Sequence, residues 1–401
     1  MKANQLVAGL LFLLICGWAC PPPVHAAPEH DVICDTQGCI SLSKFQSGIS
    51  SRLNGGVVGY VGYVGMSLFD FFDAGLARTT TDPPSLQIFS TQSINVASLS
   101  KVLTTIGVLK SLAAHGLTLD TKIEPYLYAD WTKGPNIDTI TFRDLLTHRS
   151  GFRGPPPNGP CGQFTIYSEL KNQIALGVTL ADKAAASYNN CNFGIFREML
   201  PFMEEWPGVA LYPLKTDSER AADSAAFYIY YMNLKVFRVI GIHADCKPPN
   251  VDHILSYPFP PGATPGDDFG DFTLKCGAGG WQLSAADMHK LLFNIIRGDE
   301  LLSSGEKKRM FDDHLGWDNS VRSDCPDPYP CKNGAFENSV NAWVRTYAGI
   351  FKCTVPVVLF LNSDVPPPYD PGEDIIGLVK DAYLGAAVPD APNAPHPKCP
   401  P

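Results

Sequence analysis

The sequence predicts an α+β fold in which an antiparallel sheet is assembled from both ends of the chain and a helical lobe is inserted between them. Strand-like segments near both ends and helical periodicity through the middle lead to this prediction. Of the 401 residues, 45% are hydrophobic and only 18% are charged, which excludes a disordered chain and a charge-rich coiled coil. This length suits one large domain or two fused lobes.

The first 26 residues have the pattern of a secretory signal peptide. Lys2 supplies the positive start, and the apolar stretch Leu6–Cys16 is too short to span a bilayer. The small residue Ala26 marks the expected cleavage site. Lipoprotein processing at Cys20 is the alternative, but the bulky Trp18 lies where small residues are required. We therefore expect a secreted protein, extracellular or periplasmic, with no transmembrane anchor in the mature chain.

The N-terminal half contains helical segments with recognisable ends. Residues 40–53 predict an amphipathic helix, and residues 57–72 predict a bent, glycine-rich strand. Residues 98–115 predict a mostly buried helix, because apolar residues recur at intervals of three and four residues. Gly116 is expected to end this helix. A capping-box pattern at residues 141–144 opens another helix.

The C-terminal half returns to strands after more helix. Residues 171–231 are mainly helical in character, and a second capping box at residues 284–287 opens a helix that runs to Arg297. Two strands over 341–352 and 355–362 and a helix over 373–384 follow. We therefore predict one domain over residues 27–385 and a proline-rich tail without a core over 386–401.

The cysteines predict disulfides rather than a metal site. Of 12 cysteines, Cys16 and Cys20 fall in the signal segment, and the even remainder is typical of a secreted, disulfide-bonded chain. The close pairs Cys34/Cys39 and Cys325/Cys331 are the easiest to bridge, whereas the others cannot be paired from sequence. Zinc is the alternative, but there is no CxxC and no histidine pair at ligand spacing. We expect no metal and no cofactor.

Charge and motifs exclude several functions. The net charge is −9 and no basic cluster occurs, so we expect no nucleic-acid partner. A G-x-S-x-G elbow, a P-loop, a G-x-G-x-x-G loop and an H-E-x-x-H helix are all absent. The pattern that remains is S-x-x-K, which places a hydroxyl and an amine on one face of a helix. A lysine with a lowered pKa can activate a serine there.

This pattern occurs four times, beginning at Ser41, Ser98, Ser168 and Ser304. Only Ser98 opens a long apolar helix that a core must surround. Its position at the helix start also supplies backbone N–H groups and a positive dipole end, which favour an oxyanion. Ser98 and Lys101 are therefore the candidate nucleophile and base.

Three segments together resemble the serine β-lactamase-related family, which includes class C β-lactamases, DD-peptidases and esterases. They are Asn95–Lys101, Leu117–Ile123 and Ile140–Gly151. The resemblance extends over about residues 40–385 and implies a β-lactamase/transpeptidase-like fold, with the active site between the sheet and a helical lobe. The histidine of the third segment, His148, resembles a structural position, and we interpret it as a hydrogen-bonding residue rather than a base.

The resemblance implies two further motifs. The family's Y-x-N motif fits Tyr188-Asn189-Asn190 in its context, whereas Tyr231-Met232-Asn233 fits by letters alone. It implies that Tyr188 exchanges protons with Lys101 and that Asn190 orients the substrate. A core tyrosine with a satisfied hydroxyl is the structural alternative.

For the family's third motif, K-T-G or H-x-G, we choose Lys332-Asn333-Gly334, which precedes the two C-terminal strands. Lys275-Cys276-Gly277 matches by letters but belongs to another family segment. In this interpretation Lys332 meets an anionic end of the substrate, and the backbone N–H of Ser98 and one from the strand after Gly334 form the oxyanion hole. A solvated surface lysine is the alternative.

We therefore predict a serine hydrolase that forms an acyl-serine on an ester, amide or β-lactam carbonyl. Asn333 in place of the motif's threonine favours an esterase or D-amino-acid peptidase over an efficient β-lactamase, and efficient nitrocefin turnover would contradict this. The expected partner is a small-molecule or peptide substrate, and the oligomeric state stays open. The alternative function is a catalytically silent, disulfide-stabilised binding protein with the same fold.

Overall fold

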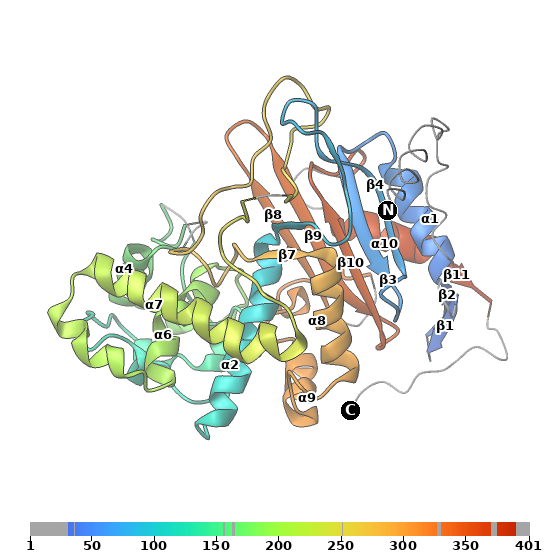
Figure 1. Cartoon of the computed structure of the whole chain (residues 1–401). Coiled ribbons are helices and arrows are strands. Elements are labelled where there is room, and N and C mark those ends of the chain that lie inside the picture. Colours follow the sequence, from blue (N-terminus) through green and yellow to red (C-terminus); the bar gives the residue numbers. More distant parts are fainter. Residues whose placement is uncertain are drawn as a thin grey trace, which may run out of the picture.

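The computed structural model describes residues 31–35, 37–154, 157–162, 165–250, 252–326, 330–369 and 375–389. The predicted signal segment and residues 390–401 of the predicted tail, with Cys399, lie outside the described residues. The rest combines a central antiparallel sheet, helices on both of its faces and a helical lobe beside it (Figure 1). The predicted α+β class is confirmed.

The central sheet joins the two ends of the chain, as predicted. Its order is β5 (Leu86–Gln87), β4 (Phe71–Arg78), β3 (Gly59–Val64), β10 (Val355–Leu361), β9 (Trp343–Phe351) and β8 (Cys331–Glu337). The N-terminal and C-terminal parts meet where β3 pairs with β10, with Val61 opposite Phe360. Strand β8 forms one edge, so half of its backbone groups face away from the sheet.

The prediction of a single bent strand over 57–72 is wrong, because the segment forms the hairpin of β3 and β4. The chain reverses at Gly65, whose φ of 138° is accessible to glycine and strained for other residues. The side chain of Asp70 closes this turn by accepting a hydrogen bond from the backbone N–H of Ser67 at 2.9 Å. Glycines recur here at every third residue, and the last of them, Gly65, forms a turn that the apolar pattern of the segment does not predict.

Helices cover both faces of the sheet. Helices α1 (Leu42–Leu53) and α10 (Ile375–Gly385) pack together on one face, and α8 (Ala285–Arg297) packs on the other (Figure 1). The predicted capping boxes are confirmed at α8 and at α3 (Phe142–Leu146). Below α1, a small sheet contains β1 (Val32–Asp35), β2 (Gly38–Ser41) and β11 (Ala387–Val388). The strand β11 thus lies within the segment predicted as a tail, residues 386–401.

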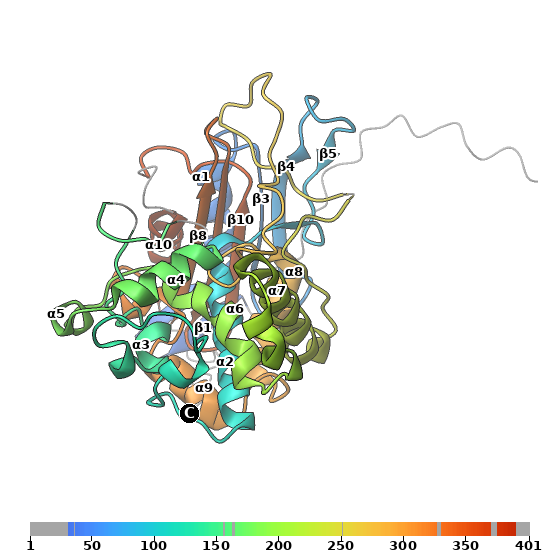
Figure 2. The same cartoon turned by 90° about the vertical axis from the view of Figure 1, so that its left-hand side faces the viewer.

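The helical lobe packs against α2 (Ser100–Ala114), which lies between the lobe and the sheet (Figure 2). As predicted, α2 is almost entirely buried. The remaining helices are α4 (Tyr167–Leu176), α5 (Leu180–Ala184), α6 (Cys191–Met203), α7 (Asp217–Met232) and α9 (Ser304–Asp312). A two-stranded sheet of β6 (Ser93–Asn95) and β7 (Gln282–Ser284) leads into α2. Short 3₁₀ and π segments are η1 (Ala97–Leu99), η2 (Glu124–Tyr126), η3 (Ile137–Thr139), η4 (Pro207–Leu214), η5 (Asn233–Phe237), η6 (Arg238–Ile240) and η7 (Asp318–Ser320).

Disulfides tie several of these segments together. The two local bridges predicted from sequence, Cys34–Cys39 and Cys325–Cys331, are confirmed. The structure also pairs Cys161 with Cys191 and Cys246 with Cys276. Such cross-links are typical of proteins that fold in an oxidising compartment. Within the described ranges, every helix is too short or too polar to cross a membrane.

Candidate active site

Ser98 lies in η1, the 3₁₀ turn that leads into α2, and is half-buried. The preceding residue, Ala97, has φ of 47°, a strained conformation for a residue with a Cβ. Two polar contacts hold this turn. The Asn95 side chain accepts a hydrogen bond from the Ala97 N–H at 3.0 Å, and Thr346 Oγ1 donates to the Val96 carbonyl at 2.9 Å. The sheet therefore fixes the backbone from which the Ser98 hydroxyl projects.

Lys101 lies one helical turn further and is fully buried. Its Nζ donates to Ser98 Oγ at 2.9 Å, to Asn190 Oδ1 at 2.9 Å and to the Ala278 carbonyl at 2.7 Å. Burial is the largest cause that lowers the pKa of Lys101, and the ammonium of Lys332 adds to it against the opposing effect of Tyr188. A lysine held in this way can give up a proton more readily than one in water.

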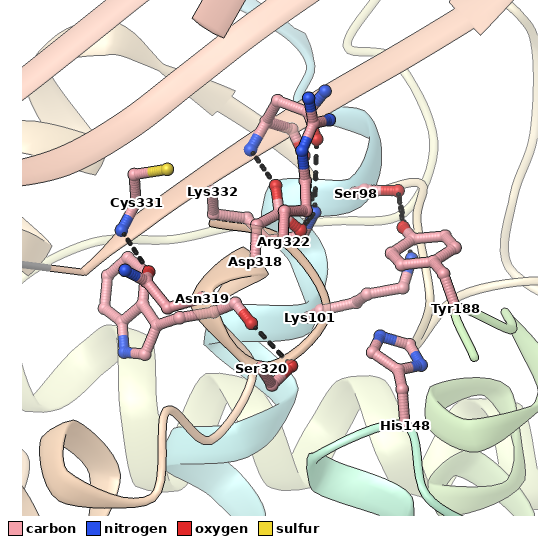
Figure 3. Close-up of polar contacts among 12 residues, drawn as sticks. Ser98, Lys101, His148, Tyr188, Asp318, Asn319, Ser320, Arg322, Cys331 and Lys332 are labelled. Carbon is pink, nitrogen blue, oxygen red and sulfur yellow. Dashed lines mark hydrogen bonds and ion pairs between the residues drawn. The ribbon is translucent and has the colours of Figure 1, made fainter. Parts of the chain in front are cut away.

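Tyr188 reaches the same serine from the helical lobe, just before α6. Its hydroxyl donates to Ser98 Oγ at 2.8 Å (Figure 3). The ammonium groups of Lys101 and Lys332 lie 4.9 Å and 5.2 Å from the centre of its ring. Desolvation raises the pKa of the Tyr188 phenol, but the two positive charges outweigh it, so the pKa falls below the ordinary value of 10. The sequence-predicted trio thus converges on one point.

The imidazole of His148 packs against the ring of Tyr188. The two rings lie 4.5 Å apart, and His148 Nδ1 accepts a hydrogen bond from the Asn189 N–H at 3.2 Å. Burial is the largest cause that lowers the pKa of His148 well below 6.5, and the charges of Lys101 and Lys332 add to it. The imidazole is therefore neutral at pH 7, which agrees with its interpretation as a hydrogen-bonding residue.

The competing motif matches do not converge in this way. Ser41 caps the start of α1, where its hydroxyl accepts from the Lys44 N–H at 3.2 Å. Tyr231 donates its hydroxyl to the buried carbonyl of Gly107 at 3.0 Å. Cys276, in the second match to the third motif, is disulfide-bonded to Cys246. Each of these residues has a structural role.

Gly334 brings strand β8 directly against the Ser98 turn. A Cβ on Gly334 would lie 2.8 Å from the Val96 carbonyl oxygen and 2.9 Å from the Ser98 backbone nitrogen. Both distances are shorter than van der Waals contact. Only glycine therefore permits this approach of the strand to the turn.

The register of β8 determines which backbone N–H groups face the site. The Ile350 N–H donates to the Pro330 carbonyl at 3.0 Å, which fixes the alternation of the β8–β9 ladder. The Asn333 N–H consequently points away from β9 and donates to Asp318 at 2.9 Å. Ala335, two residues along, presents its N–H to the same side and lines the pocket.

The predicted third motif places Lys332 on β8 beside the site, where its ammonium has a partner within the protein. It donates to the Asp318 carboxylate at 2.6 Å (Figure 3) and to the Asn333 carbonyl at 2.8 Å. The predicted contact with an anionic end of the substrate stays a prediction. The side chains of Lys332 and Asp318 are 1% and 3% exposed. No local sequence signal marks Asp318 as a site residue, because it is an aspartate in a short turn fourteen residues before Lys332.

A pocket of about 400 Å³ opens above these groups. From the predicted site, Ser98, Tyr188, Asn190 and Asn333 line it. The other lining residues, which the sequence analysis did not identify, are Ala186, Asp318, Val321, Arg322, Ala335 and Phe336. Arg322 is paired with Asp324 at 2.5 Å. Ser98, Tyr188 and Ala335 of the edge strand β8 therefore surround one solvent-accessible space.

The close approach of Gly334 yields a first prediction. For the serine hydrolase proposed below, we expect Gly334→Ala to lower kcat/KM by about 100-fold, because the added methyl displaces β8 from the Ser98 turn and with it the proposed oxyanion donor on this strand. Steady-state kinetics with an aryl ester measure the loss, and thermal melting checks folding. Gly305→Ala is the control, since a Cβ there meets no atom within 4 Å. Full activity of Gly334→Ala would contradict this role.

Comparison with known proteins agrees with the geometry. The β-lactamase family model matches residues 91–201, which contain Ser98, Lys101, Tyr188 and Asn190. No curated protein sequence matches the chain.

Solved structures match over most of the chain. A β-lactamase/D-alanine carboxypeptidase from Pseudomonas syringae has a TM-score of 0.60 at 13% identity, covering 86% of this chain and 99% of that one. A D-amino acid amidase from Ochrobactrum anthropi has a TM-score of 0.58 at 16% identity, with coverages of 86% and 97%. A class C β-lactamase from Rhodobacter sphaeroides has a TM-score of 0.57 at 15% identity, with coverages of 86% and 98%. The predicted resemblance and the β-lactamase/transpeptidase-like fold are therefore confirmed, while identities this low show the fold alone.

Proposed function

We propose that this chain, with its β-lactamase/transpeptidase-like fold, is a serine hydrolase that cleaves an ester or amide bond through an acyl intermediate on Ser98. One observation carries the proposal. Ser98 Oγ lies within hydrogen-bond distance of both Lys101 Nζ, at 2.9 Å, and the Tyr188 hydroxyl, at 2.8 Å, at the edge of an open pocket. A serine hydroxyl requires such a neighbouring base to become nucleophilic.

In the proposed reaction, Tyr188 in its phenolate form takes the proton of Ser98 as Oγ attacks the substrate carbonyl carbon. The ammonium of Lys101 stabilises the phenolate and the incoming oxygen. When the C=O bond re-forms, the bond to the leaving group breaks and the leaving group receives the proton from Tyr188. A water molecule then attacks the acyl-serine with the same proton transfers in reverse, releasing the acid and free Ser98.

The negative charge that develops on the carbonyl oxygen requires hydrogen-bond donors in fixed positions. We propose the backbone N–H groups of Ser98 and Ala335 for this role. Ser98 lies at the start of a buried helix, and the register of β8 turns the Ala335 N–H toward the pocket. Gly334 keeps the two segments in contact. Ala335 is therefore the residue that we propose for the donor expected on the strand after Gly334.

The remaining predicted site residues contact Lys101, line the pocket or change the pKa of Tyr188. Asn190, which accepts from Lys101 at 2.9 Å, is in position to orient the substrate amide or ester. Asn333 lines the pocket beside it. Lys332 lies behind the pocket and lowers the pKa of Tyr188 by its charge. We propose esters or D-amino-acid peptides ahead of β-lactams as substrates.

We also propose that the domain over residues 27–385 acts after secretion. The disulfides joining Cys161 to Cys191 and Cys246 to Cys276 support an oxidising compartment. Both bridges adjoin the site, since Cys191 follows Asn190 and Cys276 precedes the Ala278 carbonyl that binds Lys101. Detection of the mature chain in the extracellular or periplasmic fraction, with a new N-terminus after Ala26, tests this proposal.

A labelled fluorophosphonate, followed by peptide mapping, tests the hydrolase proposal. We expect a single covalent adduct on Ser98, and a second adduct there with labelled penicillin only if the pocket also accepts a β-lactam. Ser168 and Ser304 carry the same S-x-x-K letters and serve as internal controls that stay unlabelled. The absence of any adduct on folded protein would favour the alternative, a catalytically silent binding protein.

The charges around Tyr188 predict opposite pH shifts for two variants. The charge of Lys332 lowers the pKa of both Lys101 and Tyr188, whereas the charge of Asp318 raises both. Because the proposed reaction requires Tyr188 to lose its proton, kcat/KM increases with pH along an ascending limb. We expect Lys332→Met to move this limb to higher pH and Asp318→Asn to move it to lower pH. The pH profiles measure both shifts, and displacement in the same direction would contradict the model of charge control.

A further inference from the structure

We propose that Asp318 makes this site select substrates that carry no carboxylate beside the scissile bond. Its carboxylate forms an ion pair with the ammonium of Lys332, at an N–O distance of 2.6 Å, so this ammonium is already neutralised when a substrate binds. The inference rests on the proposed hydrolase function and narrows its substrate class to uncharged esters and amides, so that peptides whose leaving group is a free D-amino acid become poor substrates.

Both oxygens of Asp318 are engaged. Oδ1 accepts from Lys332 Nζ, and Oδ2 accepts from the Asn333 backbone N–H at 2.9 Å. The adjacent Asn319 reinforces the placement, because its side chain accepts from the Cys331 N–H at 2.9 Å. The Cys325–Cys331 disulfide closes the same loop against β8. These contacts hold the Asp318 carboxylate against β8, and it would have to break both of its hydrogen bonds to free Lys332 for another anion.

The layout also places a negative group, rather than a positive one, at the pocket wall. Asp318 lines the pocket and Lys332 does not, and both side chains are almost fully buried, at 3% and 1% exposed. A substrate carboxylate in this pocket would approach an ammonium that the Asp318 carboxylate already neutralises. Like charges at short range in a partly desolvated site repel each other and cost binding free energy.

The other cations near the site do not supply a replacement. The ammonium of Lys101 is fully buried and directed to Ser98, Asn190 and the Ala278 carbonyl. Of the described residues that line the pocket, Arg322 and Asp318 are the charged ones, and Arg322 is held by Asp324. The formal charge of the lining therefore sums to zero, which suits an uncharged substrate.

Two acetates with the same acyl group test the inference: phenyl acetate and 3-carboxyphenyl acetate, which carries a carboxylate on the leaving group. We expect wild-type protein to prefer phenyl acetate by about tenfold in kcat/KM, and Asp318→Asn to reduce this preference by about tenfold. The ratio of the two substrates cancels any effect of the variant on the shared chemistry. A wild-type preference for the carboxylated ester would overturn the inference without any variant.

Two further variants identify the charge responsible. In Asp318→Asn/Lys332→Met the gain toward the carboxylated ester is expected to vanish, because the released ammonium is gone. Asp324→Asn removes an acid from a more exposed pair, with side chains 26% and 42% exposed, and is expected to change the ratio less than Asp318→Asn. An equal effect of Asp324→Asn would overturn the assignment to Lys332 and Asp318.

The same assays separate this inference from the proposed function. If neither acetate is hydrolysed and Ser98 takes no fluorophosphonate, the hydrolase proposal has failed and the inference fails with it. If wild-type protein hydrolyses phenyl acetate but the ratio does not respond to Asp318→Asn on folded protein, only the inference about substrate charge has failed. Thermal melting and fluorophosphonate labelling of each variant establish that the site is folded.

Discussion

Ser98→Ala is expected to lower kcat/KM for an aryl ester by about 10⁴-fold or more, because no acyl intermediate can form without its Oγ. The fluorophosphonate adduct is expected to disappear with it. The fold should persist, since Lys101 keeps its hydrogen bonds to Asn190 and to the Ala278 carbonyl. Steady-state hydrolysis, intact mass after labelling and thermal melting measure these three outcomes.

Ser304→Ala is the matched control for this variant. Ser304 also begins an S-x-x-K sequence at the start of a helix, α9, but it is exposed and lies outside the pocket. We expect its activity to stay within about twofold of wild type, as is usual for a surface substitution. Retention of most activity in Ser98→Ala, or loss of labelling in Ser304→Ala, would show that the nucleophile is assigned incorrectly.

Lys101→Met is expected to have the second largest effect, a loss of about 10³-fold in kcat/KM, within the range for removal of a positioned acid–base group. Methionine fills a similar volume but leaves Ser98 Oγ and Tyr188 without their cation. The pKa of Tyr188 is then expected to rise, because the positive charge of Lys101 is a main cause of its lowering. Ester hydrolysis measured from pH 6 to pH 10 reports the loss, and it should be smallest at the highest pH.

Lys110→Met on the same helix is the control for Lys101→Met. Lys110 lies more than two turns further along α2, where its ammonium donates to the Leu301 carbonyl at 2.8 Å, away from the pocket. We expect its activity and pH profile to match those of wild type. A Lys101→Met variant that keeps more than a tenth of wild-type activity would argue against stabilisation of the Tyr188 phenolate and of Ser98 Oγ by this ammonium.

The relation between sequence and structure differs between the two halves of the site. Ser98 and Lys101 are predictable because three residues on one helix fix their proximity, whatever the rest of the chain does. Tyr188 and Asn190 need the resemblance to a known family, because ninety residues of helical lobe separate them from Ser98. The structure then brings them to within hydrogen-bond distance of Ser98 and Lys101.

For Lys332, the motif predicts the position of the residue but not the partner of its side chain. Its letters and its position before the C-terminal strands place it correctly at the start of β8, next to the site. The partner of its ammonium is decided by η7, a short turn that has no recognisable pattern. A hairpin likewise replaces the predicted strand over 57–72, because Gly65 takes a positive φ and the Asp70 side chain closes the turn, neither of which the apolar pattern of the segment reveals.

By itself, the sequence determined the α+β class, the helix starts and the serine–lysine pair, since each depends on interactions within a few residues or on the hydrophobic pattern of one element. The tertiary structure alone decided the longer disulfide pairings, the Ala335 N–H at the sheet edge and the neutralisation of Lys332 by Asp318. Each of these depends on the distance and direction between separate segments, which are fixed only when the elements pack around a common core.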